Sequence, residues 1–279
     1  IFPKNCPSCG SKTVKEFNKV TKKNDAVRRC SSEGYKCEKI SIEKLKHFVS
    51  KEAFNIDGLG KKIVEGFWKL KLIQLPQDIF KLDYNKIEKL EGWGRLSVEN
   101  LQYSINQKKN ISLERFIFAL GIRHIGLENA KLLSKHFKSF ENFQSLSKNK
   151  NYEDLLNIDG IGETQVSSIK NFFTNETNIE VLNELGKILV IKNATAKKNN
   201  GLLNNKSFLV TGKLNGISRA EVKSLIEENS GIIVSSVSNK LNYLITGEKP
   251  TKRKVESAKE LKISIINQDE FLKMLNMTS

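Results

Sequence analysis

The sequence FNIDGLGKKIV occupies residues 54–64, and a related sequence, LLNIDGIGETQV, occupies residues 155–166. Another copy, LEGWGRLSV, lies between them at residues 90–98, and a weaker copy, LGIRHIGLENA, lies at residues 120–130. The second glycine of the pattern recurs at intervals of 34, 32 and 36 residues. This spacing indicates one structural unit repeated four times, with helices that begin at Gly60, Gly94, Gly126 and Gly162.

Each copy except the third has two glycines around one apolar residue, followed by a helical pattern. Glycine permits a tight turn with positive φ, so we expect a helix, a short hairpin and a second helix. The second helix begins at the second glycine and presents free N–H groups and the positive end of its dipole. A phosphate oxygen suits that position, which predicts sequence-independent binding to duplex backbone. The alternative is that each Gly-x-Gly only closes a pair of helices.

The residues beside the glycines differ between the copies. The first copy adds Lys61 and Lys62, the second adds Arg95, and the third carries Arg123. The fourth has Glu163, whose carboxylate would repel a phosphate, so we expect this copy to be mainly structural. The predicted DNA-binding residues are Gly58, Gly60, Lys61, Lys62, Gly92, Gly94, Arg95, Arg123, Gly126, Gly160 and Gly162.

Two hairpin residues depart from the common pattern. His124 replaces the first glycine of the third copy, and we expect a surface or capping residue there. Trp93 lies between the glycines of the second copy, where it is either exposed or packed on the neighbouring repeat. Packing is the reading that we favour.

All four cysteines lie in the first 37 residues, at Cys6, Cys9, Cys30 and Cys37. Two residues separate the first pair, a spacing that lets both thiolates reach one metal ion, and the second pair completes a tetrahedral set. Six residues separate the second pair, and Gly34 would help that longer loop turn. We predict a structural Zn²⁺ with no open catalytic position. Four reduced structural cysteines are the alternative.

The chain has 279 residues, a net charge of +16 and a pI of about 9.6. Residues 1–109 contribute +10, from 23 Lys and Arg against 13 Asp and Glu. Such a basic excess favours a polyanion as partner, although a general bias toward Lys would also produce it. No apolar run approaches the roughly 20 residues needed to span a bilayer, so we expect no membrane association.

The composition divides the chain into parts. Residues 1–38 bear the cysteines, residues 39–192 contain short amphipathic helices, and the polar residues 193–206 form a linker. Residues 207–279 alternate β-branched and helical patterns, which predicts a small, largely parallel sheet with helices on both faces. The expected βαββαβα elements are a strand at 206–212, a helix from a Ser218–Glu221 capping box to a Gly231 cap, strands at 232–237 and 243–246, a helix at 254–261, a strand at 263–266 and a helix at 269–275.

Three residues of this last part suggest a phosphate pocket. Thr211 offers a hydroxyl, Gly212 a backbone N–H and Lys254 an ammonium group. The alternative is that Thr211 and Gly212 form only the turn after the first strand, and that Lys254 is a solvated residue at a helix start.

The combination resembles the carboxy-terminal half of the bacterial NAD-dependent DNA ligases. Residues 2–11 (FPKNCPSCGS) match the entry to the family's zinc finger, and LKHFVS at 45–50 matches the segment before the first hairpin. The resemblance implies a multidomain chain: a four-cysteine zinc finger at 1–38, an all-α helix–hairpin–helix domain at 39–192, and an α/β BRCT domain at 207–279. The last domain matches in VTGKL at 210–214, VSSVS at 234–238, YLITGE at 243–248 and AKEL at 258–261.

The chain departs from the family pattern at three places. The gap between Cys30 and Cys37 is one residue longer than the spacing usual in the family. Phe271 stands where a BRCT domain often has Trp, and Lys252-Arg253 replaces the usual Gly-Ser before the pocket lysine. The last two differences affect only the phosphate pocket.

The resemblance also implies an activity for the whole protein. These ligases join 5′-phosphate and 3′-hydroxyl ends at nicks during replication and repair, using NAD, Mg²⁺ and a lysine in a Lys-x-Asp-Gly motif. This chain lacks that motif, so we assign it no catalytic residue and expect it to grip nicked duplex without reacting with NAD or sealing. We further expect a monomer in the bacterial cytoplasm, associated with the nucleoid.

Three other functions compete with this one. The first is a non-catalytic DNA-repair scaffold that combines hairpins with a BRCT domain. The second is a nuclease subunit, which is disfavoured because the hairpin carboxylates Asp57 and Asp159 are far apart in sequence. The third is a protein-interaction module in which BRCT reads phosphoserine and the hairpins are only structural.

Overall fold

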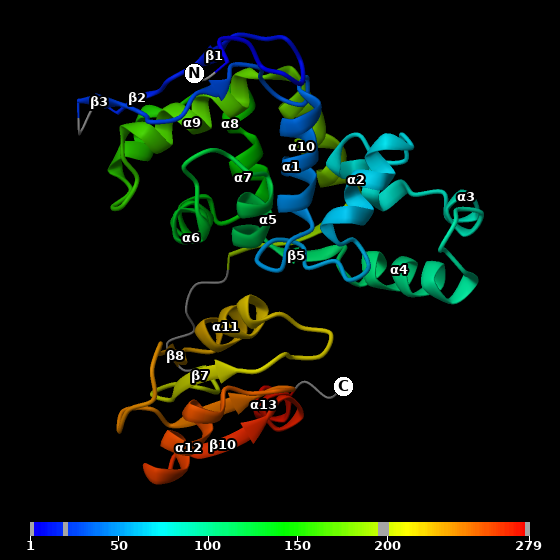
Figure 1. Ribbon diagram of the computed structural model, residues 1–279. Helices are drawn as coiled ribbons and strands as arrows, with labels where there is room; N and C mark the ends of the chain where they lie inside the picture. The colour runs from blue at the N-terminus through cyan, green and yellow to red at the C-terminus, as the bar shows by residue number, and fades with distance from the viewer. Residues whose placement is uncertain (1–2, 19–21, 195–200, 277–279) are drawn as a thin grey trace. The chain divides into compact units, whose positions relative to one another are not determined.

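The computed structural model describes residues 3–18, 22–194 and 201–276. The chain divides into two compact units, residues 1–194 and residues 195–279 (Figure 1). The cysteine-bearing segment and the hairpins therefore share one unit. No helix in the described part of the chain has both the length and the apolar composition needed to cross a membrane.

The first unit is built from short helices around one continuous apolar core. Phenylalanine supplies much of that core: the rings of Phe48 and Phe54 stack at 4.2 Å, and Phe143 meets Phe173 edge to face at 5.2 Å. The helices are α1 (Glu38–Phe48), α2 (Lys61–Lys69), η1 (Pro76–Lys81), α3 (Tyr84–Glu88), α4 (Arg95–Gln107), α5 (Leu113–Ala119), α6 (Leu127–Phe137), α7 (Phe140–Gln144), α8 (Leu146–Asn149), η2 (Glu153–Asn157), α9 (Glu163–Thr174) and α10 (Glu176–Ile188).

A short parallel pair of strands closes this helical region. Strand β5 (Asn110–Ser112) pairs with β6 (Val190–Lys192), so the start of α5 is tied to the end of α10. The sequence predicts only helices between residues 39 and 192, and that prediction is wrong for these two strands. Each strand has three residues, too few for the alternation that marks a strand in a sequence.

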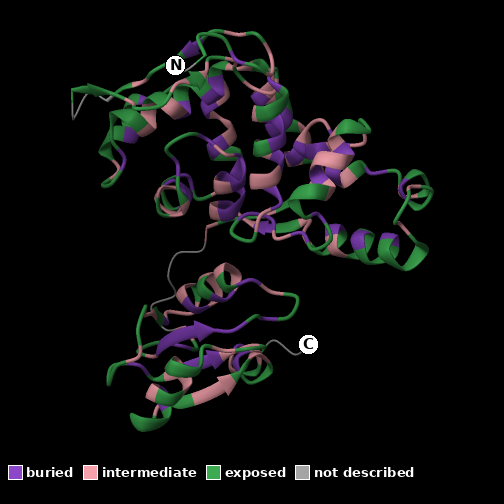
Figure 2. Ribbon diagram, viewed as in Figure 1, coloured by how far each residue is buried: buried purple, intermediate pink, exposed green. Residues whose placement is uncertain are grey.

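Two antiparallel pairs organise the cysteine-bearing segment. Strand β1 (Thr13–Val14) pairs with β4 (Arg29–Cys30), and β2 (Phe17–Asn18) pairs with β3 (Lys23–Asn24). The segment enters α1 directly, because Cys37 is the N-cap residue of that helix. This part of the chain buries few apolar side chains, and much of it is exposed in Figure 2.

The elements of the second unit follow the predicted βαββαβα order: β7 (Ser207–Thr211), α11 (Arg219–Glu228), β8 (Ile232–Ile233), β9 (Tyr243–Thr246), α12 (Lys252–Glu260), β10 (Ser264–Asn267) and α13 (Gln268–Met274). The four strands form a parallel sheet with the order β10-β9-β7-β8. Helices α11 and α13 pack on one face with Phe208 and Val210, and α12 packs on the other with Leu209 and Leu244.

Local details of this unit correct the sequence analysis. Ser218 and Glu221 form the predicted capping box. At the other end of α11, however, Ser230 takes the left-handed conformation with φ +66°, and Gly231 follows it and donates its N–H to Ile226. A side chain on Gly231 would clash with Ile226, because an added Cβ lies 2.5 Å from its Cγ2 atom. Close packing therefore explains this glycine.

Two predicted boundaries also shift. Strand β8 covers Ile232–Ile233, where the sequence predicted a strand at 232–237. Leu203, assigned to the linker at 193–206, is fully buried in the core of the second unit. Residues 195–200 of that linker lie outside the described residues.

Candidate metal centre and nucleic-acid interface

The four hairpins share one backbone conformation. The first glycine of the pattern is left-handed at Gly58, Gly92 and Gly160, with φ of +87°, +79° and +89°. His124 takes the same conformation in the third hairpin, with φ +59°. A histidine can therefore replace the first glycine without changing the path of the chain, although a left-handed conformation is uncommon for such a residue.

The second glycine of each hairpin is the N-cap residue of the following helix. Its φ is negative in all four copies. The positive φ expected of the hairpin glycines is therefore needed only at the first position of the pattern. All four of these glycines are exposed, as are the residues that directly follow Gly60 and Gly94. Helices α2, α4, α6 and α9 thus begin at solvent-exposed turns, where the first N–H groups of a helix have no partner within the helix.

The residue between the glycines anchors each hairpin. Leu59, Ile125 and Ile161 are buried in the core of the first unit. Trp93 is half-buried and lies 5.4 Å from the ring of Phe67, which confirms that it packs on the neighbouring repeat. The buried middle residue fixes the hairpin, and the flanking glycines face outward.

The hairpins associate in pairs. A Cβ on Gly58 of the first hairpin would lie 3.2 Å from Leu101 of α4, and one on Gly160 of the fourth would lie 2.8 Å from Leu132 of α6. His124 links the third hairpin to α9 through a 3.0 Å hydrogen bond between its Nδ1 atom and the hydroxyl of Ser168. The first copy therefore packs with the second, and the third with the fourth.

The basic residues of the first two hairpins are available to an anion. Lys61 and Lys62 are exposed, and the described part of the chain gives them no ion-pair partner. Arg95 is exposed and pairs with Glu99 at 2.9 Å, one helical turn away. Such exposed pairs contribute little stability, so a phosphate can compete for this guanidinium.

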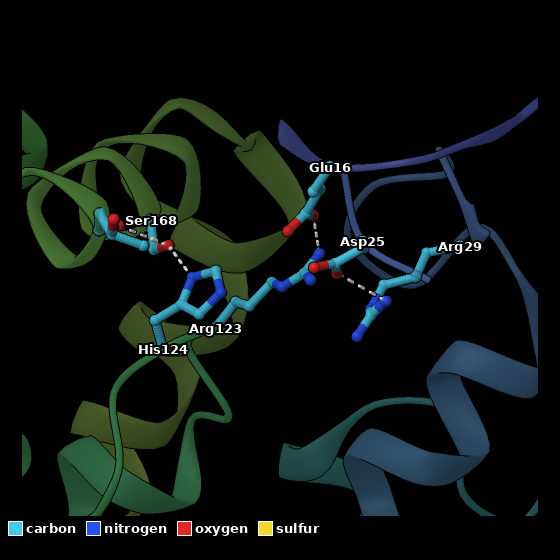
Figure 3. Close-up of polar contacts among 7 residues, drawn as sticks. Glu16, Asp25, Arg29, Arg123, His124 and Ser168 are labelled. Carbon is cyan, nitrogen blue, oxygen red and sulfur yellow. Dashed lines mark hydrogen bonds and ion pairs between the residues drawn. The ribbon is translucent and has the colours of Figure 1, made fainter. Parts of the chain in front are cut away.

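Arg123 of the third hairpin has a different environment (Figure 3). Its guanidinium forms an ion pair with Glu16, which lies between β1 and β2 of the cysteine-bearing segment. Beside it, Arg29 pairs with Asp25 at 3.1 Å. Both guanidinium groups thus have carboxylate partners, and Arg123 contributes to the attachment of the cysteine-bearing segment.

His124 lies next to this cluster. Burial lowers the pKa of His124 below its usual range, and the guanidinium groups of Arg123 and Arg29 lower that pKa further. The neutral imidazole is therefore favoured. Glu16, Asp25 and Ser168 could not be identified from the sequence, because no local pattern connects them with a hairpin that is up to 107 residues away.

In the fourth hairpin, a side chain of the following helix accepts a hydrogen bond at the helix start. The backbone N–H of Gly162 donates to the side-chain oxygen of Gln165 at 3.2 Å, and Glu163 occupies the first position of α9. An acidic residue at a helix N-terminus interacts favourably with the dipole. These contacts support a mainly structural role for this copy.

The four cysteines converge on one point. All four Sγ atoms lie within 4.8 Å of one another; the Cys6–Cys37 distance is 4.0 Å and the Cys9–Cys30 distance is 3.4 Å. Tetrahedral zinc with Zn–S bonds of about 2.3 Å separates its sulfur ligands by about 3.8 Å. The donor set and its dimensions can therefore hold a metal ion such as zinc.

Short backbone contacts position these ligands. The N–H of Gly10 donates to the carbonyl of Cys6 at 2.9 Å, which closes the first knuckle. The β1–β4 pairing places Cys30 opposite Thr13, and Gly34 turns the longer second loop with φ +62°, as predicted. Hydrogen bonds from Ser11 lower the pKa of Cys9 to about 6, whereas burial raises that of Cys30 to about 12. A bound metal would displace the proton from Cys30.

The suggested phosphate pocket is partly occupied by the protein's own contacts. Thr211 is buried, and its hydroxyl accepts the N–H of Thr251 at 3.1 Å. Gly212 is left-handed with φ +89°, and a Cβ there would lie 2.8 Å from the backbone of Gly247. Lys254 is half-buried in the first turn of α12. Thr211 therefore lies at the start of α12. These contacts favour the alternative in which Thr211 and Gly212 form the turn after the first strand.

Two family models match the chain, one in each of its two units. A family model described as Helix-hairpin-helix motif matches residues 115–182, and another described as BRCA1 C Terminus (BRCT) domain matches residues 198–275. The chain is 68% identical over 276 residues to a DNA ligase of Pelagibacter ubique (strain HTCC1062), a match that covers 99% of this chain and 41% of that protein. The chain matches the carboxy-terminal part of a bacterial DNA ligase.

More distant relatives give the same result. The chain is 40% identical over 283 residues to a DNA ligase of Wolbachia pipientis wMel, covering 99% of this chain and 42% of the relative. It is 41% identical over 283 residues to a DNA ligase of Rickettsia canadensis (strain McKiel), covering 97% and 40%. These matches confirm the resemblance to bacterial DNA ligases, and the chain spans about two fifths of their length.

Proposed function

We propose that this chain is the duplex-binding part of an NAD-dependent DNA ligase that seals nicks between 5′-phosphate and 3′-hydroxyl ends in replication and repair. Its partner is nicked double-stranded DNA. The names of the relatives and the two family models support a ligase. A non-catalytic repair scaffold would share the hairpins and the BRCT domain, but the 68% identity to a DNA ligase favours the first function.

The exposed helix starts of the first two hairpins carry the proposal. Gly60 and Gly94 leave the N–H groups of α2 and α4 open to solvent, and Lys61, Lys62 and Arg95 add positive charge beside them. Phosphate contacts of this kind position a protein on duplex DNA without reading its sequence. Holding the ends of a nick in line lowers the entropic barrier to joining them.

The four thiolates of Cys6, Cys9, Cys30 and Cys37 would bind a structural Zn²⁺. Such a set leaves no open coordination position, so this metal supplies folding energy and takes no part in the chemistry. The ion pair between Glu16 and Arg123 attaches the metal-binding segment to the third hairpin. Zinc would therefore help to fix that segment on the hairpin domain.

The chemical steps belong to the whole ligase. NAD and Mg²⁺ would be bound mainly by parts of the parent protein outside this chain, which would neither react with NAD nor seal a nick by itself. The chain would act as a monomer in the bacterial cytoplasm, associated with the nucleoid. Within the chain, the third and fourth hairpins would contribute more to holding the first unit together than to binding DNA. Their residues are Arg123, Gly126, Gly160 and Gly162.

The salt dependence of binding tests the proposal. Replacing Lys61 or Lys62 with Ala should weaken binding of a nicked duplex and make the plot of log affinity against log salt shallower by about 0.9 for each phosphate that is no longer neutralised. Lys69→Ala, an exposed lysine at the other end of α2, is the matched control. Fluorescence anisotropy over a salt series measures these slopes. Slopes for Lys61→Ala and Lys62→Ala equal to that of the control would contradict the proposed phosphate binding.

A further inference from the structure

Helix α4 carries two large apolar side chains on its outer surface. Leu96 is 71% exposed and Tyr103 is 67% exposed, and neither belongs to the core of the first unit. The side chains that bury the inner face of α4 are Val98, Leu101 and Ile105. Figure 2 shows much of α4 as exposed. The folding of the helix therefore does not account for Leu96 and Tyr103.

The two residues lie on one face. They are seven positions apart, about two turns, and Asn100 and Gln107 fall on the same line because residues four apart are neighbours on a helix. All four are exposed. The stripe is defined by the uncharged residues Leu96, Asn100, Tyr103 and Gln107. The carboxylate of Glu99, which adjoins Leu96 and Tyr103 on the helix, is paired with Arg95 at 2.9 Å.

The stripe begins inside the second hairpin's helix start. Leu96 is the second residue of α4, so its own N–H is one of the groups left free at that end. A phosphate bound there would lie beside the Leu96 side chain. Helical side chains also lean toward the N-terminus of their helix, which directs Leu96 and Tyr103 toward the hairpin.

We propose that this stripe is a non-ionic contact surface for the sugar–phosphate backbone of duplex DNA. This proposal rests on the function proposed above, because the stripe continues from the phosphate site at Gly94. Leu96 and Tyr103 pack on apolar faces of deoxyribose, and the Asn100 and Gln107 amides donate to phosphate oxygens. Leu96 and Tyr103 are about 10.5 Å apart along the helix axis, close to the axial rise of three nucleotides in one strand.

Removal of the apolar groups should weaken binding without altering its ionic part. Leu96→Ala and Tyr103→Ala should each reduce the affinity of the intact chain for a nicked duplex about 3- to 10-fold, because less apolar area is buried on binding. The salt slope should stay unchanged, since no phosphate-bound cation is removed. Leu70→Ala is the matched control, because Leu70 is 53% exposed at the opposite end of α2 from the first hairpin. All three residues are exposed, so the melting temperature should not move.

A second variant tests the stripe by adding a positive charge. Leu96→Lys would place an ammonium group beside the bound phosphate, tighten binding at low salt and steepen the salt slope by about 0.9. The proposal is overturned if both alanine variants bind like Leu70→Ala, or if Leu96→Lys leaves the slope unchanged; either result would leave a protein partner as the occupant of the stripe. Normal slope changes in Lys61→Ala and Lys62→Ala would then show that the proposed duplex binding itself survives.

Discussion

At the residue scale, two lysines on the same helix have opposite environments. Burial lowers the pKa of Lys44 to about 8, and its Nζ atom lies 4.6 Å from the centre of the Tyr35 ring. Lys46, two residues later, bonds to Glu43 and Glu65 at 2.6 Å each, and these hydrogen bonds raise its pKa. Position in the fold, not residue type, decides how readily each amine loses its proton.

This contrast predicts selective reactivity. At pH 8 about half of the Lys44 amines should be neutral and nucleophilic, so an amine-acylating reagent should label Lys44 faster than Lys46. Mass spectrometry of peptides after a short pulse measures the two rates. The unfolded chain binds the Lys44 proton near pH 10.5 and the folded chain near pH 8, so lowering the pH through this window should reduce stability. Equal labelling rates would contradict the assignment.

The limits of sequence reasoning are clear at Arg123. Its place beside a glycine-turned helix start predicted a phosphate contact, and the structure pairs its guanidinium with Glu16 instead. That pairing depends on how the cysteine-bearing segment folds back on the third hairpin, which no local pattern encodes. Lys61 and Lys62 remain exposed, because nothing packs against the first hairpin's outer surface in the described part of the chain.

At the scale of elements, the helix starts of the hairpins were predictable and the strands of the first unit were not. A glycine before a periodic apolar pattern is a local signal, and Gly60, Gly94, Gly126 and Gly162 are all N-cap residues. Strands β1 to β6 have only two or three residues each, and all except the local β2–β3 pair form by pairing with distant segments. Strand β7, in contrast, has five consecutive buried residues, which made it recognisable.

The cysteine-bearing segment should depend on its metal. Its strands have two residues each and bury little apolar surface, so bonds to a metal ion would take the place of an apolar core. We expect one zinc ion per chain, and its removal by a chelator should expose residues 3–37 to proteolysis. The peptides of the second unit should remain protected, because that unit has its own two apolar clusters. Metal analysis followed by limited proteolysis measures both results.

Two outcomes would count against this account of the segment. Clearly less than one zinc per chain in carefully purified protein would remove the four-cysteine site. An unchanged cleavage pattern after complete removal of zinc would show that the segment folds without it.

At the scale of the whole molecule, the order of the parts was predictable from composition, because cysteines, glycine hairpins and β-branched runs occupy successive stretches. The grouping of the parts was not. Residues 1–194 form one unit because Tyr35 packs on the helical core and Glu16 pairs with Arg123. Leu203, in a polar stretch, belongs to the second core because it packs beneath α11 with Val222 and Ile226.

The central claim is that the helix starts at Gly60 and Gly94 bind duplex phosphates. These glycines permit a clean test, because their φ values are −64° and −116° and an added Cβ would meet nothing within 4 Å. A valine at either position should therefore leave the fold intact while covering the free N–H groups. The left-handed Gly58 and Gly92 would not permit such a test, since any side chain there is strained.

The decisive measurement is the affinity of the Gly60→Val, Gly94→Val double variant for a nicked duplex at fixed salt. Blocking both phosphate sites should weaken binding about 10- to 100-fold with an unchanged melting temperature. Gly66→Ala, inside α2 and equally free of close neighbours, should bind like the parent chain. A double variant that stays folded and binds as tightly as the parent chain would contradict the account.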